Sequence, residues 1–266
     1  MSDPINPAGR KTSHHQSLPS GWHVPHGQRL YAIGDIHGRA DLLDELHERI
    51  IVDAENASSS TVTISVYLGD YVDRGPHSMG VIERLIGNPL PGFLKVNLKG
   101  NHEDMLLRFL DDPAQGLGWI ANGGAATMAS YGLTLKDGNL TSERLPSIRD
   151  EFVARLPCEH LKFLQSLLVS YVSGDYILVH AGIRPGVPLE NQSEDDLLWI
   201  RDAFLHSPRK HGKVIVHGHT PTTEPELHPN RIGIDTAAHT SGVLTCLVLE
   251  GEERRFIATS GGLTAA

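Results

Sequence analysis

Short apolar runs alternate with helical patterns along the first hundred residues. The runs at 29–34, 61–68 and 93–98 are rich in β-branched, aromatic and leucine residues, and each predicts a buried strand. Between them, residues 40–52 and 79–86 place apolar side chains at helical spacing and predict amphipathic helices. Because strands and helices take turns, the pattern predicts an α/β architecture.

The stretch from about 104 to 165 has a different character. It contains several helical patterns and a glycine-rich segment, so we expect a helical insertion over the sheet and not a separate domain. Strand patterns return at 176–179, 214–216 and 243–249. No internal repeat is visible.

The two ends of the chain carry little that could be buried. We therefore expect a flexible lead-in over residues 1–28, a single large domain over 29–258 and a short tail over 259–266. Four histidines of the lead-in are expected to be solvated and not to bind metal: His14, His15, His23 and His26.

Composition limits the classes of function. The chain has 266 residues and a net charge of −9, so it lacks an overall basic surface for nucleic acid or an anionic membrane. No apolar run approaches the roughly 18 residues of a membrane span, and the first residues lack the apolar core of a signal peptide. The two cysteines, Cys158 and Cys246, form no disulfide framework and suit a reducing cytoplasm.

The chemistry is concentrated where the first three predicted strands end. Their sequences continue as GDIHG at 34–38, GDYVDRG at 69–75 and GNHE at 100–103. In open α/β sheets, ligands bind at the carboxyl ends of the strands, and these three segments follow one another at intervals of about one strand–helix–strand unit. We therefore expect the side chains of four residues to meet: Asp35, His37, Asp70 and Asn101.

Two further histidines follow later strand patterns, His180 in LVHAG and His219 in VHGHT. Taken alone, a Gly-Asp pair is usually a turn, an Asn-His pair is usually surface, and a strand-end histidine is usually structural. Their joint occurrence at strand ends favours a metal site instead. Carboxylate, imidazole and amide oxygen suit divalent ions, and one bridging carboxylate can serve two of them.

Together these motifs resemble the calcineurin-like metallophosphoesterase superfamily. Arg74 in GDYVDRG and Glu103 after GNH resemble its phosphoprotein phosphatase branch, which includes bacterial serine/threonine protein phosphatases. The resemblance covers residues 29 to about 250 and implies a β-sandwich flanked by helices, with two metals at one sheet edge. It implies that Asp35 and His37 bind the first metal and that Asp70 bridges both. It further implies three ligands for the second metal: Asn101, His180 and His219.

The same resemblance suggests catalytic roles. His102 is expected to protonate the leaving oxygen, and Asp73 to orient its imidazole. Arg74 offers a planar fork for phosphate oxygens, and Arg201 resembles a second phosphate-binding arginine of bacterial members. A surface ion pair with Asp202 or a nearby carboxylate is the alternative for Arg201.

Other motif residues are expected to support the site. His217 is two residues too early to be the ligand and is expected to be structural or to lie behind the ligands. Asp235 and Thr236 match a strand-end motif of the family and are expected to act in the same way. The segment 119–127 resembles an active-site rim, although packing explains two of its residues equally well. Its members are Trp119, Asn122, Gly123, Gly124 and Thr127.

The sequence therefore predicts a metal-dependent phosphatase that hydrolyses phosphate monoesters by attack of a metal-bridged hydroxide. Phosphorylated proteins are the first expected substrates, and small phosphoesters are the second. A symmetrical bis(5′-nucleosyl)-tetraphosphatase is the rival within this class. A nuclease is disfavoured by the acidic charge, and a non-catalytic binding module by the complete ligand set. Mn²⁺ is the expected metal, with Fe, Zn or Mg open, and the oligomeric state is also open.

Overall fold

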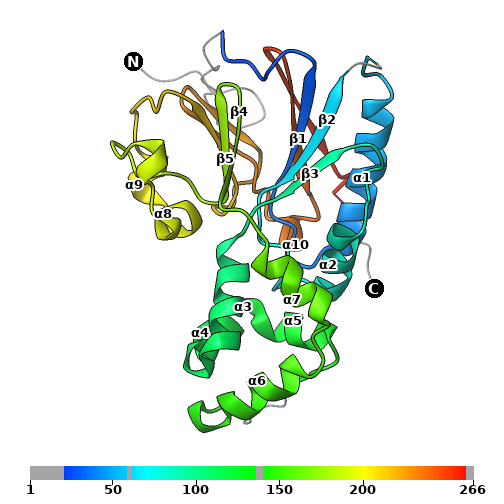
Figure 1. Cartoon of the computed structure of the whole chain (residues 1–266), viewed down its shortest axis with the longest axis vertical. Helices are drawn as coiled ribbons and strands as arrows, with labels where there is room; N and C mark the ends of the chain where they lie inside the picture. The colour runs from blue at the N-terminus through cyan, green and yellow to red at the C-terminus, as the bar shows by residue number, and fades with distance from the viewer. Residues whose placement is uncertain (1–20, 59–60, 136–139, 262–266) are drawn as a thin grey trace, which may run out of the picture.

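Two five-stranded sheets face each other at the centre of the computed structural model, which describes residues 21–58, 61–135 and 140–261 (Figure 1). The first sheet has the order β10-β9-β1-β2-β3, and the second has the order β4-β5-β6-β8-β7. The first sheet contains β1 (Gln28–Ile33), β2 (Val62–Tyr67), β3 (Leu94–Asn97), β9 (Thr245–Glu250) and β10 (Glu253–Ala258). The second contains β4 (Ser170–Ser173), β5 (Tyr176–Val179), β6 (Val214–His217), β7 (Glu226–His228) and β8 (Arg231–Gly233).

The central strand β1 is apolar on both faces because both faces are covered. Leu30 and Ala32 belong to the core between the two sheets, where they pack with residues of both sheets. Tyr31 and Ile33 alternate with them and belong to the core under the helices. The continuous apolar run therefore reflects a strand buried in a three-layer arrangement, as the sequence pattern predicts.

The strand directions bring the motif residues to one edge. β1, β2 and β3 are parallel neighbours, and β5 runs parallel to β6 in the second sheet. The carboxyl ends of all five strands consequently lie on the same side of the molecule (Figure 1). Two helices make the crossovers within the first sheet, α1 (Ala40–Ala54) and α2 (Ser78–Ile86), and they cover its outer face.

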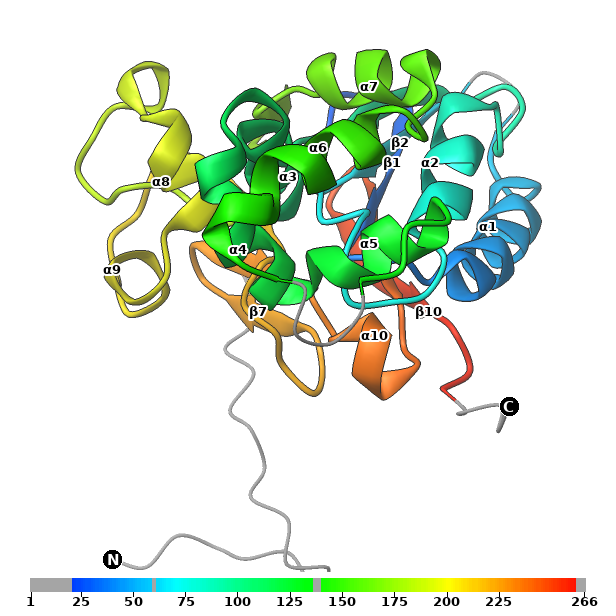
Figure 2. The ribbon, with the colours of Figure 1, turned by 90° about the horizontal axis from the view of Figure 1, so that it is seen from below.

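The predicted helical insertion forms a layer beyond the strand ends (Figures 1 and 2). It shares one continuous core with α1, α2 and the first sheet, so it is not separately packed. Aromatic contacts fill its centre, with Trp119 between Phe109 and Phe152 at ring-centroid distances of 5.1 and 5.8 Å. Its helices are α3 (Asn101–Asp111), α4 (Gly116–Trp119), α5 (Ala125–Ser130), α6 (Leu145–Val153) and α7 (Cys158–Gln165).

Three short helices complete the described fold. α8 (Glu194–Trp199) and α9 (Asp202–Leu205) pack Leu197 and Phe204 against the outer face of the second sheet. α10 (Ala238–Ser241) lies close to the strand ends (Figure 1). No helix within the described residues is both long and apolar enough to cross a membrane. Both cysteines are free.

The expected flexible lead-in over residues 1–28 extends too far along the chain, because the ordered core begins before residue 28. Val24 is buried in the core between the sheets, and its N–H donates to the carbonyl of Gly251 at 3.2 Å. A single valine in a polar context gave no periodic signal, and its partner is distant in the sequence. His23 and His26 are exposed, as expected, whereas His14 and His15 lie outside the described residues.

The expected C-terminal tail also begins too early. Thr259 is buried, and its N–H donates to the carbonyl of Leu244 at 3.1 Å. The strand pattern missed β4, β7, β8 and β10, which are short or carry charged side chains at sheet edges.

Candidate metal centre

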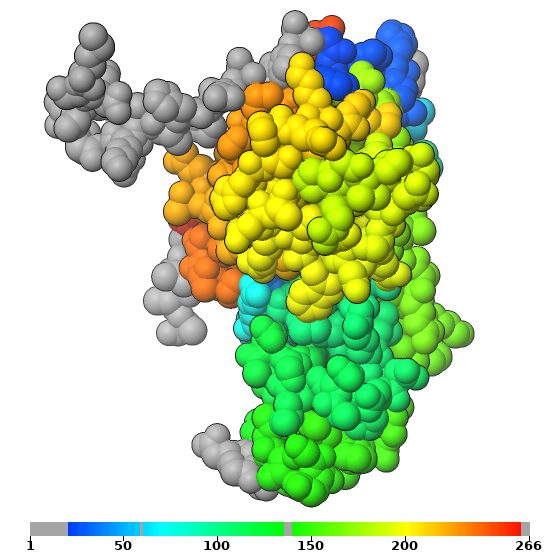
Figure 3. Space-filling view, turned by 90° about the vertical axis from the view of Figure 1, so that its left-hand side faces the viewer, coloured from blue at the N-terminus to red at the C-terminus, as the bar shows by residue number. Residues whose placement is uncertain are grey.

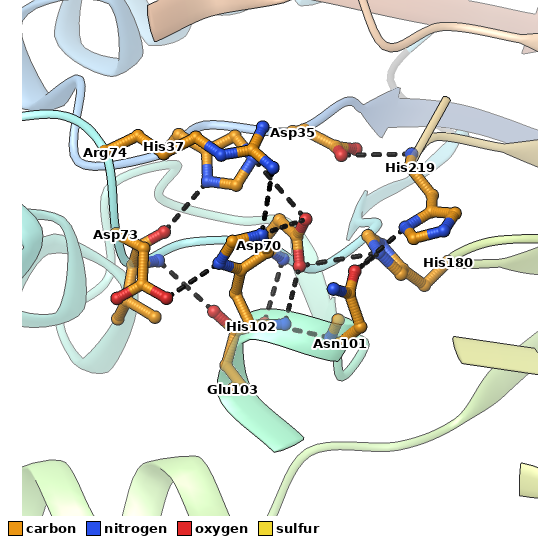
Figure 4. Close-up of polar contacts among 12 residues, drawn as sticks. Asp35, His37, Asp70, Asp73, Arg74, Asn101, His102, Glu103, His180 and His219 are labelled. Atoms are coloured by element: carbon orange, nitrogen blue, oxygen red, sulfur yellow. Dashed lines mark hydrogen bonds and ion pairs between the residues drawn. The ribbon is translucent and has the colours of Figure 1, made fainter. Parts of the chain in front are cut away.

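The strand ends place the six predicted metal-ligand residues in one buried cluster (Figure 4). Asp35 and His37 follow β1, Asp70 follows β2, and Asn101 begins α3 after β3. From the second sheet, His180 follows β5 and His219 follows β6.

Asp70 lies between two sets of donor atoms. Its Oδ2 is 3.4 Å from Nε2 of His37, and its Oδ1 is 3.4 Å from Nε2 of His180. Each set could hold one metal ion, because its donor atoms lie within 4.8 Å of one another. The first set comprises His37, Asp70 and His102, and the second comprises Asp70, His180 and His219. Sequence reasoning gave His102 another role, and the geometry places it at the edge of the first set.

The imidazoles are oriented by backbone carbonyls. Nδ1 of His37 donates to the carbonyl of Val72 at 2.9 Å, and Nδ1 of His180 donates to that of Leu68 at 2.9 Å. This arrangement leaves each Nε2 as a lone-pair donor directed at Asp70. Burial lowers the pKa of His37 to about 3 and lowers that of His180, so both rings are neutral as metal ligands must be.

Asn101 provides a direct test of whether a cation fits. Its Oδ1 lies 2.9 Å from Nε2 of His180 and 2.8 Å from Nδ1 of His219. Because the Nδ1 proton of His180 is already used, the facing Nε2 and Oδ1 atoms both present lone pairs. A shared divalent ion would satisfy them, since amide oxygen and imidazole nitrogen are suitable ligands.

The buried carboxylates point to the same conclusion. Oδ1 of Asp35 is buried without a hydrogen-bond partner among the described residues. Burial, together with the charges of Asp235 and Asp70, raises the pKa of Asp35 well above its usual range. Burial raises the pKa of Asp235 to about 6, against a hydrogen bond from Ala237. Asp35, Asp70 and Asp235 are all buried, and among the described residues none of them forms an ion pair with lysine or arginine, which fits a site built for divalent metals.

Backbone strain is concentrated at this cluster. Among the described residues, six non-glycine residues have positive φ, and five of them are predicted site residues. Such conformations cost roughly 1–3 kcal/mol each and persist only where the surroundings enforce them. The six are His37, Asp70, Asp73, Arg74, His219 and Ala237.

His102 lies beside Asp70, Asp73 and Arg74 in the cluster. Its Nδ1 donates to Oδ2 of Asp73 at 2.7 Å, and Nη2 of Arg74 lies 3.1 Å from its Nε2 (Figure 4). Burial works to lower the pKa of His102, but the charges of Asp70 and Asp73 outweigh it and raise the pKa. The predicted pairing of His102 with Asp73 is therefore present.

Each of the two predicted arginines lies beside a different set of metal-donor atoms. Arg74 contacts His102, whereas Nε of Arg201 lies 3.1 Å from Nε2 of His219. Both arginine side chains are on the exposed side of the cluster. Among the described residues, Arg201 contacts His219 and forms no ion pair with Asp202 or another carboxylate, so the surface ion pair is not observed.

Sequence reasoning missed the role of Glu103. Its buried carboxylate accepts backbone N–H bonds from Gly100, Asp70, Tyr71 and Val72 at 2.8 to 3.2 Å. Burial and the charge of Asp70 raise the pKa of Glu103 to about 7. The signal was available, because Glu103 stands three residues after the glycine that caps α3, which is the spacing of a capping box.

Two residues of the segment 119–127 form hydrogen bonds to Asp73 and do not serve packing alone. Nε1 of Trp119 donates to Oδ2 of Asp73 at 2.9 Å, and Oγ1 of Thr127 donates to Oδ1 at 2.6 Å. Gly123, with φ of 113°, accepts the N–H of Arg74 at 3.3 Å, and an added Cβ would meet Arg74. The segment thus braces the Asp73–Arg74 turn.

The remaining predicted residues support the strands around the cluster. His217 is buried, lies 3.4 Å from Nη1 of Arg231 and packs edge-on against Phe204. Asp235 caps the N–H of Ala237 at 2.9 Å, and Thr236 donates to the carbonyl of Val243 at 2.8 Å. Asn122 donates to the carbonyl of Gly118, and Gly124 packs against the ring of Trp119. His239 was not predicted, although its ring lies 5.2 Å from that of His37.

Comparison with known proteins places this cluster in a family. The model of the calcineurin-like phosphoesterase family matches residues 28–243, and the chain belongs to that family. It is thereby a metal-dependent hydrolase of phosphoric esters that uses divalent metals.

Curated relatives carry two kinds of name. The chain is 27% identical over 234 residues to an asymmetrical bis(5′-nucleosyl)-tetraphosphatase, PrpE, of Halalkalibacterium halodurans, with 81% of this chain and 87% of that one covered. It is also 27% identical over 230 residues to serine/threonine-protein phosphatase 2 of Escherichia coli, covering 83% and 92%. The tetraphosphatase named among them is asymmetrical, whereas the sequence-based rival was the symmetrical type.

A solved structure shows the same fold. The cold-active protein-tyrosine phosphatase of a Shewanella species superposes with a TM-score of 0.52 at 18% identity. The match covers 92% of this chain and 84% of that one. At this identity the likeness concerns the fold alone and confirms two sheets flanked by helices.

Proposed function

We propose that this chain hydrolyses phosphate monoesters at a two-metal centre and acts on phosphorylated serine or threonine side chains. The observation that carries the proposal is the position of Asp70, whose two carboxylate oxygens each face a histidine of a different donor set. A carboxylate shared in this way is the arrangement that two neighbouring ions require.

The ligands divide between the two positions. Asp35, His37 and Asp70 would hold one ion, and the unpartnered Oδ1 of Asp35 supports its inclusion. Asp70 would also serve the other ion, together with three residues whose donor atoms converge: Asn101, His180 and His219. Mn²⁺ is the first choice for this oxygen and nitrogen set, and Fe, Zn and Mg are alternatives. When bound, such ions neutralise phosphate charge and make a water molecule nucleophilic at neutral pH.

The protein side chains supply binding and proton transfer. Arg74 and Arg201, on the exposed side of the cluster, would each donate to phosphate oxygens. Nε2 of His102 would give a proton to the leaving oxygen, while Asp73 holds the ring through its Nδ1. Trp119 and Thr127 fix Asp73 in turn, so the donor is positioned before the substrate arrives.

Asymmetrical hydrolysis of bis(5′-nucleosyl) tetraphosphates is the second candidate, because the relative from H. halodurans is named for it. The same centre could attack a phosphoanhydride, since the metals and arginines recognise phosphoryl oxygens and not the group attached to them.

A direct comparison of substrates tests the proposal. Purified protein with Mn²⁺ would be assayed on a phosphoserine peptide and on diadenosine tetraphosphate, with the nucleotide products separated. We expect a higher kcat/KM for the peptide. Faster release of AMP and ATP would favour the second candidate, and two ADP molecules would indicate the symmetrical reaction. Activity on both substrates that is unaffected by metal removal would refute the two-metal centre.

A further inference from the structure

A cavity of about 220 Å³ lies between the helical layer and α8. Figure 3 shows these two parts of the chain against each other, with the α8 region in yellow and the helical layer in green. The cavity is lined in particular by Met105, Arg108, Gln115, Trp119, Asn122 and Trp199. None of the exposed lining residues has a role in the proposed hydrolysis.

The cavity lies directly beside the candidate metal centre. The ring centroid of Trp199 is 6.4 Å from that of His219, and Trp199 stands two residues before Arg201. On the opposite wall, Met105 is one helical turn beyond Asn101 on α3. A group attached to a phosphate held by the metal centre would therefore reach the cavity.

The lining suits a flat aromatic ring. Trp199 is 40% exposed, which leaves its indole surface available for stacking. Trp119 is 1% exposed and closes the inner side, while Met105 adds a polarizable thioether. Asn122 and Gln115 are exposed at the rim. Each amide nitrogen donates one hydrogen bond within the protein, to the carbonyl of Gly118 and to Asp112, and its second N–H and its oxygen are available to a ligand. An aromatic surface with amides at its edge is the combination that reads a nucleobase.

Ion pairs hold the two walls in place. Arg108 on α3 pairs with Asp104 of the same helix at 2.8 Å and with Asp195 of α8 at 3.3 Å. Lys99, just before α3, pairs with Glu194 at the start of α8. Such exposed pairs add little stability, but both of them connect the two walls in this structure. The space is therefore formed without a ligand.

We propose that this cavity is a nucleobase subsite, in which the base of a nucleotide stacks on Trp199 while its phosphate lies at the metal centre. The proposal rests on the proposed phosphoesterase function and adds a substrate class to that site. A flat ring with donors and acceptors on its edge would use the face of Trp199 and both amides together.

Competition between two phosphate monoesters isolates the base. AMP and ribose 5-phosphate share the phosphate and the sugar, and only AMP carries the base. Both would be measured as competitors of p-nitrophenyl phosphate hydrolysis with Mn²⁺ present. We expect AMP to compete at about tenfold lower concentration, because stacking on one aromatic ring contributes roughly that factor or more.

Variants connect this preference to the cavity. Trp199→Ala should make the two inhibition constants equal, and Trp199→Phe should restore most of the AMP preference. Leu117→Ala is the matched control, because Leu117 is 39% exposed on α4 without lining the cavity, and it should keep the preference. Equal constants in the wild type, or an AMP preference that survives Trp199→Ala, would overturn the subsite.

Two further outcomes are informative. Reduced turnover of a phosphoserine peptide by Trp199→Ala, with no AMP preference in any variant, would assign the cavity to peptides and overturn the nucleobase proposal. If the wild type fails to hydrolyse p-nitrophenyl phosphate, the proposed function fails. Calorimetric titration of AMP and ribose 5-phosphate into the same protein would then still decide the subsite, with tighter AMP binding supporting it and equal binding refuting it.

Discussion

The two sheets contribute unequal halves to the metal centre. Four strained residues follow strands of the first sheet, namely His37, Asp70, Asp73 and Arg74, whereas two follow strands of the second sheet, His219 and Ala237, and only His219 of these is a predicted ligand. The first half is also tied together by buried hydrogen bonds, such as the four backbone N–H groups that converge on the carboxylate of Glu103.

The second half is held more loosely. His180 is anchored by a hydrogen bond to the carbonyl of Leu68. Within the described part of the chain, the side chain of His219 has only Asn101 and the exposed Arg201 as hydrogen-bond partners. The difference indicates that hydrogen bonds within the protein fix the first half more tightly than the second. Preorganised groups give catalysis its precision, so changes in the two halves should differ in kind.

Loss of the shared ligand should have the largest effect. Asp70→Asn removes the charge between the two donor sets, so both ions should be lost and hydrolysis should fall to background. Asn101→Ala should release only the ion on the second side. Metal content measured by mass spectrometry after dialysis would separate the variants. Chelation of the wild type should abolish activity, and Mn²⁺ should restore it. Equal metal loss in the two variants would contradict a bridging role for Asp70.

Substitution of His102, the proposed proton donor, should have the next largest effect on turnover, and the size of that effect should depend on the substrate. A serine alkoxide is a poor leaving group, whereas p-nitrophenolate leaves readily without a proton. His102→Asn should therefore lower kcat by about 10²–10⁴-fold on a phosphoserine peptide and clearly less on p-nitrophenyl phosphate. Asp73→Asn should show the same order more weakly, since Asp73 only orients the ring. Equal losses on both substrates, with metal content intact, would favour electrostatic stabilisation of the phosphoryl group by His102 instead.

Substitution of the two arginines allows a direct comparison of phosphate binding in the two halves. Arg74→Ala and Arg201→Ala should each weaken inhibition by inorganic phosphate by about tenfold or more, because charge-assisted hydrogen bonds contribute roughly 1.5–3 kcal/mol. Metal content should remain unchanged in Arg74→Ala. Arg201→Ala should also slightly lower the affinity for the metal ion beside His219, since Arg201 contacts that histidine. A collapse of metal occupancy in Arg74→Ala would show that its assigned role is wrong.

The order and direction of the strands explain which site residues could be predicted from the sequence. Asp35, Asp70 and Asn101 were placed together because parallel strands end at one edge, and that inference needs only the apolar runs and the motifs after them. The alternation of strands and helices was sufficient for the α/β fold.

Contacts between distant segments were not predictable in this way. Trp119 and Thr127 form hydrogen bonds to Asp73, which is 46 and 54 residues away in the sequence, and no local sequence pattern indicates such a partner. The cavity beside Trp199 likewise depends on how α8 is positioned relative to α3. The short sequence pattern of α8 does not predict that position. Short strands such as β8 and its edge neighbour β7 were missed because three residues are too few for a periodic signal.

The smallest predicted effect tests whether the brace on Asp73 matters to catalysis. Thr127→Val keeps the shape but removes the hydroxyl that donates to Asp73 at 2.6 Å and accepts its N–H at 2.8 Å. Ser78 still accepts that N–H at 3.1 Å, so we expect a loss of about 1–3 kcal/mol in the free energy of unfolding and an intact fold. A less constrained Asp73 should orient His102 less well. Turnover of a phosphoserine peptide should therefore fall several-fold, with little change on p-nitrophenyl phosphate. Ser166→Ala, which removes a hydroxyl bond at the exposed end of α7, should leave both rates unchanged. Equal slowing of both substrates by Thr127→Val would show that the brace supports the metal centre as a whole and not the proton donor.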